Sequence, residues 1–356
     1  MSRKPTMDIG SDVRQNRRIE KIKQITTSRG LSECVLCNTQ TRISQIQSDK
    51  TATIRSFIPS KMKVCSANKT PILAMLFSAA VFREMAKQGR SRSFVRLLTE
   101  ADIITDSDRH KTVGEIFDVA FEAMQIVGQR YEYVYRSAMV HRALTETQSI
   151  RTVSILNEFR VGNSKADLVI LDNTATVYEI KSERDSLARL ANQLDNYKRV
   201  FAKVHVIASE DHIAGVLKTV ADDVGVMCLN SHCQVTTVRE ALERPERTNP
   251  VVLFESLRLA EAITILQAIG VVVPDVPNTQ RHAAMREIFG TIDPTATHAE
   301  MVKTLKHTRN QASLGDFLAH LPKSLQAAAL MVSVRRSEYS QVISAIKTPL
   351  HQVMDW

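Results

Sequence analysis

The 356-residue sequence has no long hydrophobic run. Its longest apolar stretch, residues 71–82, is interrupted by Ser78 and falls short of the roughly 20 residues that a membrane-spanning helix needs. Basic residues near the N-terminus have no apolar segment behind them, so no secretory signal is predicted. We therefore expect a cytoplasmic protein with no membrane partner.

Cysteine is also sparse. The chain has five cysteines, an odd number that cannot form a complete disulfide framework in a protein of this length. Cys34 and Cys37 have the spacing of half a zinc site, which Cys228, His232 and Cys233 would have to complete without a second well-spaced pair. Buried or idle thiols are the favoured interpretation.

Two kinds of catalytic motif are missing. No Walker-type or glycine-rich phosphate loop is present, so ATP hydrolysis is not supported. His110, His141, His205 and His212 form no recognisable pair with a nucleophile, and we interpret them as solvated or core side chains.

Positive charge is in excess, with 47 Lys and Arg against 38 Asp and Glu and a formal net charge of +9. Such an excess favours an anionic partner, and nucleic acid is the common one because each neutralised phosphate releases a counterion. A merely solvated basic surface is the alternative. Hydrophobic residues make up 44% of the chain, enough to fill the cores of about two domains.

The hydrophobic periodicity divides the chain into three regions. Residues 1–70 are polar and predict a basic, flexible or loosely packed arm. Residues 71–240 combine helical and strand patterns and predict an α/β domain, and residues 241–356 predict an all-helical C-terminal region. Helices are expected at residues 72–88, 94–98, 112–128, 131–144, 185–201, 212–220, 251–269, 279–289, 298–305 and 321–346, and strands at 154–161, 166–171, 175–182, 204–208, 225–229 and around 235.

One short segment brings acidic side chains together. Residues 172–174 separate two strand patterns, and a hairpin turn centred on Asn173 would place Asp167 opposite Glu179. Strand alternation adds Lys181 to the same face as Glu179. Two opposed carboxylates on a partly apolar face destabilise a strand pair unless a positive charge compensates them.

Two interpretations of this cluster remain open. Lys181 alone would make it a structural ion-pair cluster. A divalent cation would make it a hydrolytic site, since Mg²⁺ prefers carboxylate oxygens and accepts a substrate phosphate in its remaining positions.

The same residues resemble the signature of the PD-(D/E)XK nuclease superfamily. Gly-x-x-x-x-Asp at residues 162–167 is similar to its entry strand, and the hairpin followed by acid-x-Lys is similar to its active site. A Gln-x-x-x-Tyr element downstream is similar to that of RecB-type and phage exonuclease-like members. The run over residues 131–208 resembles an uncharacterised bacterial family placed in that superfamily. The matching residues are Asp167, Glu179, Lys181, Gln193 and Tyr197.

The resemblance implies a restriction-endonuclease-like mixed central sheet flanked by helices. It implies Mg²⁺ or Mn²⁺ as cofactor, with Asp167, Glu179 and the backbone carbonyl of Ile180 as ligands. Glu158 and Glu132 are further candidate ligands, although a surface or capping role is the simpler interpretation of each.

The helix expected at residues 185–201 has a role in this scheme. Gln193 and Tyr197 would join the catalytic set, and Arg189, one turn before Gln193, is a candidate for nucleic-acid binding. A wet border residue of an amphipathic helix is the equal alternative for Arg189.

The expected function is Mg²⁺-dependent hydrolysis of DNA, in defence against foreign DNA or in DNA repair. A homo-oligomer would supply the two sites that cutting both strands commonly requires. A catalytically silent nucleic-acid-binding protein with a nuclease fold is the main alternative, and an interaction protein built around the C-terminal helices is a third.

Overall fold

A computed structural model describes residues 69–146, 152–353 and 356. The expected arm at residues 1–70 therefore lies almost entirely outside the described residues, as do Cys34 and Cys37. The described residues belong to one compact unit, Val64–Trp356, which includes the C-terminal helices. The boundary expected at residue 240 stays a prediction.

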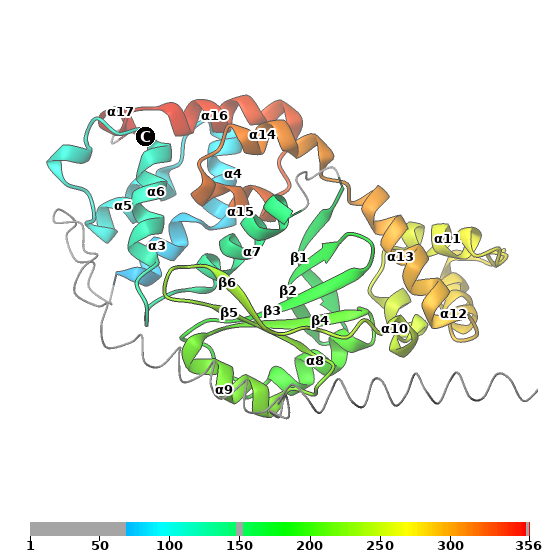
Figure 1. Ribbon diagram of the computed structural model, residues 1–356. Helices are drawn as coiled ribbons and strands as arrows, with labels where there is room; N and C mark the ends of the chain where they lie inside the picture. Colours follow the sequence, from blue (N-terminus) through cyan, green and yellow to red (C-terminus); the bar gives the residue numbers. More distant parts are fainter. Residues whose placement is uncertain (1–68, 147–151, 354–355) are drawn as a thin grey trace, which may run out of the picture. The chain divides into compact units, whose positions relative to one another are not determined.

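A six-stranded mixed sheet forms the centre of this unit (Figure 1). Its spatial order follows the chain, with antiparallel pairs β1–β2, β2–β3 and β5–β6 and parallel pairs β3–β4 and β4–β5. The expected α/β class with a mixed sheet is confirmed. The strands are β1 (Ser154–Val161), β2 (Ser164–Leu171), β3 (Ala175–Lys181), β4 (Lys203–Ser209), β5 (Gly225–Leu229) and β6 (Val235–Arg239).

The two parallel pairs require crossover connections, and two helices supply them. Helix α8 (Leu190–Lys198) connects β3 to β4, and α9 (Glu210–Thr219) connects β4 to β5. The expectation that the first of these helices begins at residue 185 is wrong. Asp185 accepts hydrogen bonds from the Ser182 backbone and hydroxyl, and such side-chain turns compete with helix formation.

Within the described part of the chain, five helices precede the sheet: α3 (Thr70–Leu76), α4 (Ala79–Gln88), α5 (Arg92–Ala101), α6 (Val113–Met124) and α7 (Glu132–Glu146). The single helix expected at residues 72–88 is divided, because Ser78 adopts an extended conformation and restarts the helix. The capping box of Thr112 and Glu115 starts α6 as expected.

After β6 the described residues form helices and short turns, and none of them adds another strand to the sheet. Two of the long helices that the periodicity predicts are interrupted. The helix expected at 251–269 is broken at residues 256–258, and the helix expected at 321–346 is broken at residues 332–338. The helices are α10 (Pro250–Glu255), α11 (Leu259–Ala268), α12 (Asn278–Phe289), α13 (Pro294–Thr308), α14 (Gly315–Ala319), α15 (Lys323–Met331), α16 (Tyr339–Lys347) and α17 (Leu350–Val353). Short 3₁₀ turns lie at Asp106–Asp108, Pro245–Arg247, Ala312–Leu314 and Arg336–Glu338.

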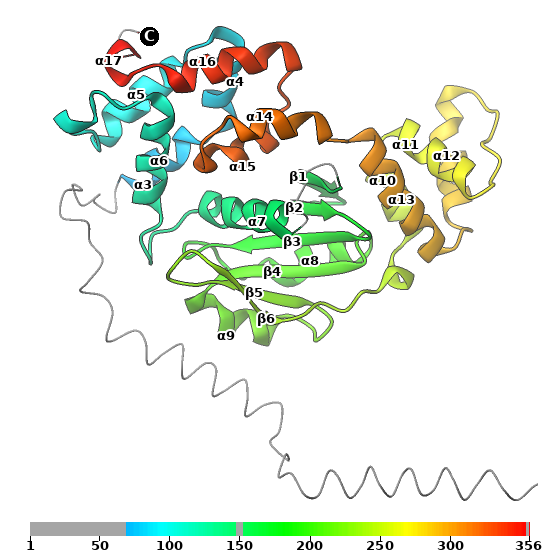
Figure 2. The same ribbon diagram turned by 45° about the horizontal axis from the view of Figure 1, so that its top comes forward.

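The two faces of the sheet belong to two different hydrophobic cores. Tyr178 and Ile180 face the core formed with α3–α7 and α14–α17, whereas Val169 and Val177 face the core formed with α8–α13. Figures 1 and 2 show α7 on one side of the sheet and α8 and α9 on the other. A slip of one residue in register would exchange these faces, so burial fixes the register strongly.

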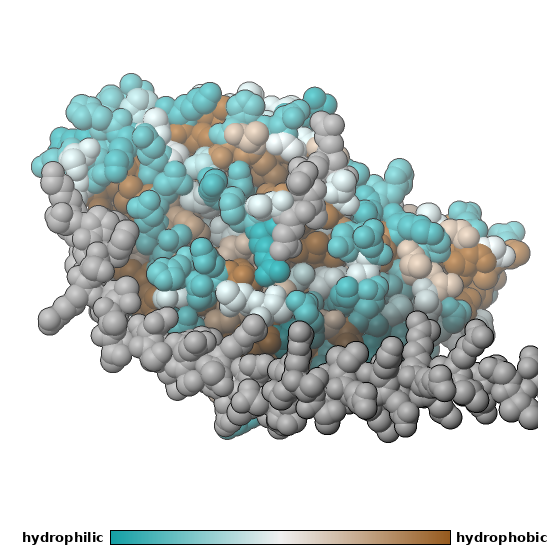
Figure 3. Space-filling view, viewed as in Figure 1, coloured by the Kyte–Doolittle hydropathy of each residue, from teal (hydrophilic) through white to brown (hydrophobic). Residues whose placement is uncertain are grey.

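The surface of the protein and its described cysteines give three further observations. In Figure 3 hydrophobic colour gathers over the connection between α11 and α12, where Val272 is 85% exposed. Among the described helices, none has the length and apolarity to cross a bilayer. Cys228 is buried in β5, Cys233 is half-buried and His232 is exposed.

Candidate active site at the open end of the β2–β3 hairpin

The hairpin has the register that the sequence predicts. Leu171 pairs with Ala175 and Val169 pairs with Val177. Asp172 closes the turn, since its Oδ1 atom accepts a hydrogen bond of 3.0 Å from the Thr174 backbone N–H. This half of the hairpin is a regular antiparallel ladder, and Thr176 is the one residue in it without an apolar or aromatic side chain.

The ladder ends at the pair Leu168–Tyr178, one residue before Asp167 and Glu179 would meet. The Ile180 backbone N–H instead donates a hydrogen bond of 2.8 Å to Asp167 Oδ2, so a carboxylate takes the place of a backbone carbonyl. On the other side of β2, Glu158 stands where it would pair with Asp167, but it has a left-handed φ of 54° and is not paired. Asp167 thus lies at an opening in both ladders, which we call the open end of the hairpin.

Glu179 lies at the centre of a buried network that contains four of the five expected catalytic residues. Its side chain is 2% exposed, and Lys181 Nζ lies 2.8 Å from its Oε1 atom. Lys181 Nζ also donates a hydrogen bond of 3.0 Å to Gln193 Oε1. The Tyr197 hydroxyl lies 2.8 Å from Glu179 Oε2 and 2.9 Å from the Lys165 carbonyl oxygen, and its single proton serves these two acceptors. Helix α8 thereby brings Gln193 and Tyr197 to the acid-x-Lys element of β3.

If both acids of this site were ionised, they would carry more negative charge than their surroundings neutralise. Burial, followed by the charges of Glu179 and Glu132, raises the pKa of Asp167 to about 8. Burial and the charge of Glu179 also raise the pKa of Tyr197, which keeps its hydroxyl protonated as a donor. A positive charge bound beside Asp167 would reverse the shift of its pKa.

Helix α7 supports the site through Arg136, a buried side chain that bonds to the backbone of Asp167. Arg136, which is 4% exposed, donates hydrogen bonds of 2.7 Å to the Asp167 carbonyl oxygen and 2.9 Å to Asn157 Oδ1. It also forms an ion pair with Glu132 one turn earlier. Asn157 Nδ2 in turn donates a hydrogen bond of 3.1 Å to the Leu330 carbonyl oxygen of α15. Arg136 therefore holds the backbone of Asp167 in place.

The end of β3 is held by a second buried arginine. Arg130, which is 1% exposed, places Nε 2.7 Å from Glu183 Oε1, and its backbone N–H donates to Glu183 Oε2. Its guanidinium also donates to the carbonyl oxygens of Leu229 and Asn230 at the end of β5. These bonds of Arg130 fix the position of the chain at Glu183, two residues beyond Lys181.

Sequence reasoning missed both arginines. Arg130 and Glu183 are 53 residues apart, so no local pattern joins them. Glu132 and Arg136 do have a recognisable spacing of four residues on one helix, and that signal could have identified the pair.

The remaining candidate residues lie outside the network. The half-exposed Glu132 is near enough to raise the pKa of Asp167, but its carboxylate is paired with Arg136. Glu158 is exposed and forms an ion pair of 2.8 Å with Lys165, which lowers its pKa. Arg189 is exposed and directly precedes α8.

The donor chemistry of the open end fits a hard divalent cation. Asp167 and Glu179 supply carboxylate oxygens, and both main-chain polar groups of a strand residue lie on one side, so the Ile180 carbonyl faces β2 as its N–H does. Among the described residues, no three His, Cys, Asp or Glu side chains gather closely enough to hold a metal by themselves. A cation here would depend on two carboxylates and a main-chain oxygen.

The comparison with protein families covers this whole region. The family described as Bacteriophage P4 protein cII matches residues 126–345, more than half of the chain. The chain belongs to this family. The match to the cII family includes the entire network from Arg130 to Tyr197 and leaves α3–α6 outside.

Individual relatives add two comparisons. Protein cII of Enterobacteria phage P4 is 28% identical over 221 residues, which cover 59% of this chain and 78% of that protein. A protein of unknown function from Silicibacter pomeroyi, whose structure is solved, has 20% identity over 37% of this chain and 86% of its own. Its TM-score of 0.25 is too low to support an argument about fold or function.

Proposed function

We propose that the protein is a metal-dependent nuclease that hydrolyses DNA phosphodiester bonds. The observation that carries the proposal is the meeting of Asp167, Glu179 and Lys181 at the open end of the hairpin, with Gln193 and Tyr197 bonded to them. These five residues are those that resemble the PD-(D/E)XK signature. Under this proposal the mixed sheet with helices on both faces is a restriction-endonuclease-like fold, and defence or DNA repair is the setting.

Each residue has a part in the proposed chemistry. Asp167 and Glu179, with the Ile180 carbonyl, would hold Mg²⁺ or Mn²⁺. The metal would polarise the phosphodiester and lower the pKa of the attacking water. Lys181 supplies a fixed positive charge beside the acids to stabilise the charge that develops on phosphate oxygens. Gln193 orients the Lys181 ammonium, and Tyr197 orients the Glu179 carboxylate.

The competing interpretation of the cluster is structural. Lys181 neutralises the carboxylate of Glu179, yet the charged form of Asp167 is so poorly compensated that its pKa rises to about 8. A purely structural cluster gains nothing from a second buried acid, because a buried charge without a partner costs stability. This imbalance favours a site that awaits a cation.

Cleavage assays test the proposal directly. The wild-type protein is incubated with linear, circular and single-stranded DNA, with Mg²⁺, with Mn²⁺ and with a chelator. We expect metal-dependent cleavage that falls at least a hundredfold in Glu179→Gln and in Lys181→Met. Asp172→Asn, which changes a carboxylate at the turn of the same hairpin, is the matched control and should retain activity.

Two results would contradict the proposal. One is cleavage that survives in both site variants. The other is salt-sensitive DNA binding with no cleavage under either metal, which would establish the alternative of a catalytically silent nucleic-acid-binding protein.

A further inference from the structure

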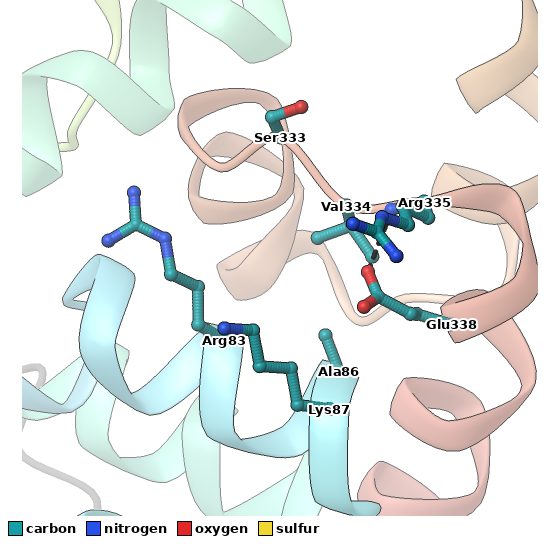
Figure 4. Close-up of a pocket in the computed structure, with 7 residues that line it drawn as sticks. All are labelled: Arg83, Ala86, Lys87, Ser333, Val334, Arg335 and Glu338. Carbon is teal, nitrogen blue, oxygen red and sulfur yellow. Dashed lines mark hydrogen bonds between the residues drawn. The ribbon is translucent and has the colours of Figure 1, made fainter.

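A cavity on the helical side of the protein carries positive charge. It has a volume of about 390 Å³ and lies between α4 and the segment that joins α15 to α16 (Figure 4). Arg83 and Lys87 line it from successive turns of α4, and Arg335, Ser333 and Glu338 line it from the other side. Three cations and one carboxylate thus surround a space large enough for a phosphate group with its neighbours.

No described residue is a charge partner of these three cations. Among the described residues, no ion pair or side-chain hydrogen bond involves Arg83, Lys87 or the Arg335 guanidinium. Glu84, the nearest acid along α4, is occupied by Ser91 and Ser93, whose hydroxyls each lie 2.7 Å from its oxygens. Like charges four residues apart on a helix repel each other, and an anion bound between them would relieve this repulsion.

A second cavity shows the contrast. It has a volume of about 480 Å³ and is lined by Lys303 and Lys306 of α13. Lys303 Nζ lies 2.6 Å from Glu300, and Lys306 Nζ donates a hydrogen bond of 2.8 Å to the Asp172 carbonyl oxygen. The cations of that cavity already have partners within the chain, so they have less charge to offer a ligand.

The lining of the first cavity selects the kind of anion. It contains no aromatic ring on which a base could stack, and its polar groups are guanidinium, ammonium and hydroxyl donors with one carboxylate. Donors of this kind bind phosphate oxygens without reading a base. A backbone phosphate therefore fits better than a free nucleotide, whose base would find no platform.

A short path of covalent bonds and hydrogen bonds joins one wall of the cavity to the candidate active site. Ser333 follows Leu330 by three residues, and Leu330 is linked through Asn157 and Arg136 to Asp167. Three residues span at most roughly 11 Å, so Ser333 and Asp167 lie within about 30 Å of each other. About nine base pairs of duplex cover that distance at 3.4 Å per step.

We infer that Arg83, Lys87 and Arg335 form an anchoring site for a backbone phosphate of DNA, separate from the site of cleavage. The inference rests on the proposed function in naming DNA as the substrate, and it adds where a distant part of that substrate is held. Arg335 lies within the region matched by the cII family, whereas Arg83 and Lys87 lie outside it. The anchor therefore joins a part of the chain within the family match to one outside it.

Salt-dependent DNA binding tests the anchor without requiring catalysis. Fluorescence anisotropy of a 20-base-pair duplex is measured between 50 and 200 mM salt in the presence of a chelator. Loss of one phosphate contact lowers the slope of log K against log salt by about 0.9. We expect Arg83→Ala/Lys87→Ala to lower the slope by about 1 to 2 and to weaken binding about tenfold at low salt. Both side chains are exposed, so the fold should be unaffected.

The matched control removes two exposed cations elsewhere, Arg199 and Lys218, as the double alanine variant. If this control loses as much slope as the anchor variant, the effect is one of total charge and the anchor is refuted. Equal slopes for the anchor variant and the wild-type protein also refute it. A third result also refutes it. Inorganic phosphate or AMP would raise the melting temperature of the wild-type protein but not of the anchor variant, while both proteins bind the duplex equally.

The outcomes separate this inference from the proposed function. Wild-type binding without cleavage, with a lower slope in the anchor variant, would remove the nuclease proposal and keep the anchor. Cleavage that depends on Glu179, with equal slopes, would keep the nuclease proposal and remove the anchor. No DNA binding by the wild-type protein would contradict both.

Discussion

At its turn the β2–β3 hairpin pairs mostly apolar residues across a regular ladder, whereas at its open end the ladder stops and charged side chains replace it. Val169 and Val177 are fully buried at the turn half, and burial of such a side chain stabilises the fold by about 1.5–3 kcal/mol. At the open end a backbone N–H is bonded to the carboxylate of Asp167, whose pKa is raised to about 8. One half of the hairpin thus contributes stability, and the other half holds buried acids that the fold does not fully compensate.

The largest expected effect separates the two halves by stability. Leu171→Ala removes a fully buried side chain near the turn, and we expect it to lower the free energy of unfolding by about 2–5 kcal/mol. Asp167→Asn at the open end replaces a buried acid whose charged form is poorly compensated, and without metal we expect it to change stability by less than about 1 kcal/mol or to increase it. Urea denaturation in a chelator measures both. Equal losses in the two variants would indicate that the acids form a structural cluster.

Arg136 tests whether the open end is held from α7. Arg136→Met removes the donors to the Asp167 carbonyl and to Asn157 and leaves Glu132 without its partner. We expect a loss of about 2 kcal/mol, as for other buried hydrogen bonds to a charged group. Arg96→Met breaks an exposed pair with Glu100 at the same spacing and should cost less than about 0.5 kcal/mol. Similar losses in both would show that Arg136 is an ordinary helix ion pair.

Acidification probes the sheet beside the turn half. His205 pairs with Tyr178 across β3 and β4, and burial, followed by the charge of Lys203, lowers its pKa to about 4. At His205 the unfolded chain then binds more protons than the folded one between pH 6.5 and 4, so this one group lowers stability by at most roughly 1.4 kcal/mol for each unit that the pH falls. His205→Gln should flatten this dependence, whereas His232→Gln at an exposed position should not. An unchanged slope in His205→Gln would assign the acid sensitivity to another group, such as His298, whose pKa is also lowered to about 4.

The smallest effect concerns the hydroxyl that joins α8 to the open end. Tyr197→Phe keeps the buried ring and removes the bond to Glu179 Oε2, so we expect a loss of about 1 kcal/mol and about tenfold slower cleavage. Tyr131→Phe is the control, because the Tyr131 hydroxyl makes no hydrogen bond among the described residues. Wild-type cleavage by Tyr197→Phe would remove Tyr197 from the positioning of Glu179.

Most of the sheet could be predicted from the sequence, because alternation and turn residues act over short distances. The hairpin register follows from the turn at Asn173 and the burial of Val169 and Val177 on one face. Helix boundaries were harder, since local side-chain bonds decide them. Asp185 bonds to Ser182 and delays the start of α8, an outcome that the stripe of leucines does not reveal.

The site was predictable where its residues are close in sequence. Glu179 and Lys181 are two residues apart on a strand, and Gln193 and Tyr197 are one helical turn apart. Arg130 bonds to Glu183 across 53 residues and to Asn230 across 100, so tertiary packing alone brings these groups together. The opening of the ladder at Asp167 also depends on how neighbouring strands pair, which pattern analysis does not specify.

Metal binding tests the central claim most directly. In isothermal titration calorimetry we expect the wild-type protein to bind Mn²⁺ or Mg²⁺ saturably at one site per chain that is lost in the double variant Asp167→Asn/Glu179→Gln. The double variant should remain folded, and a control that changes the exposed Glu158 to Gln should bind as the wild-type protein does. Equal uptake by the wild-type protein and the double variant, or no uptake by either, would contradict the account of the open end as a cation site.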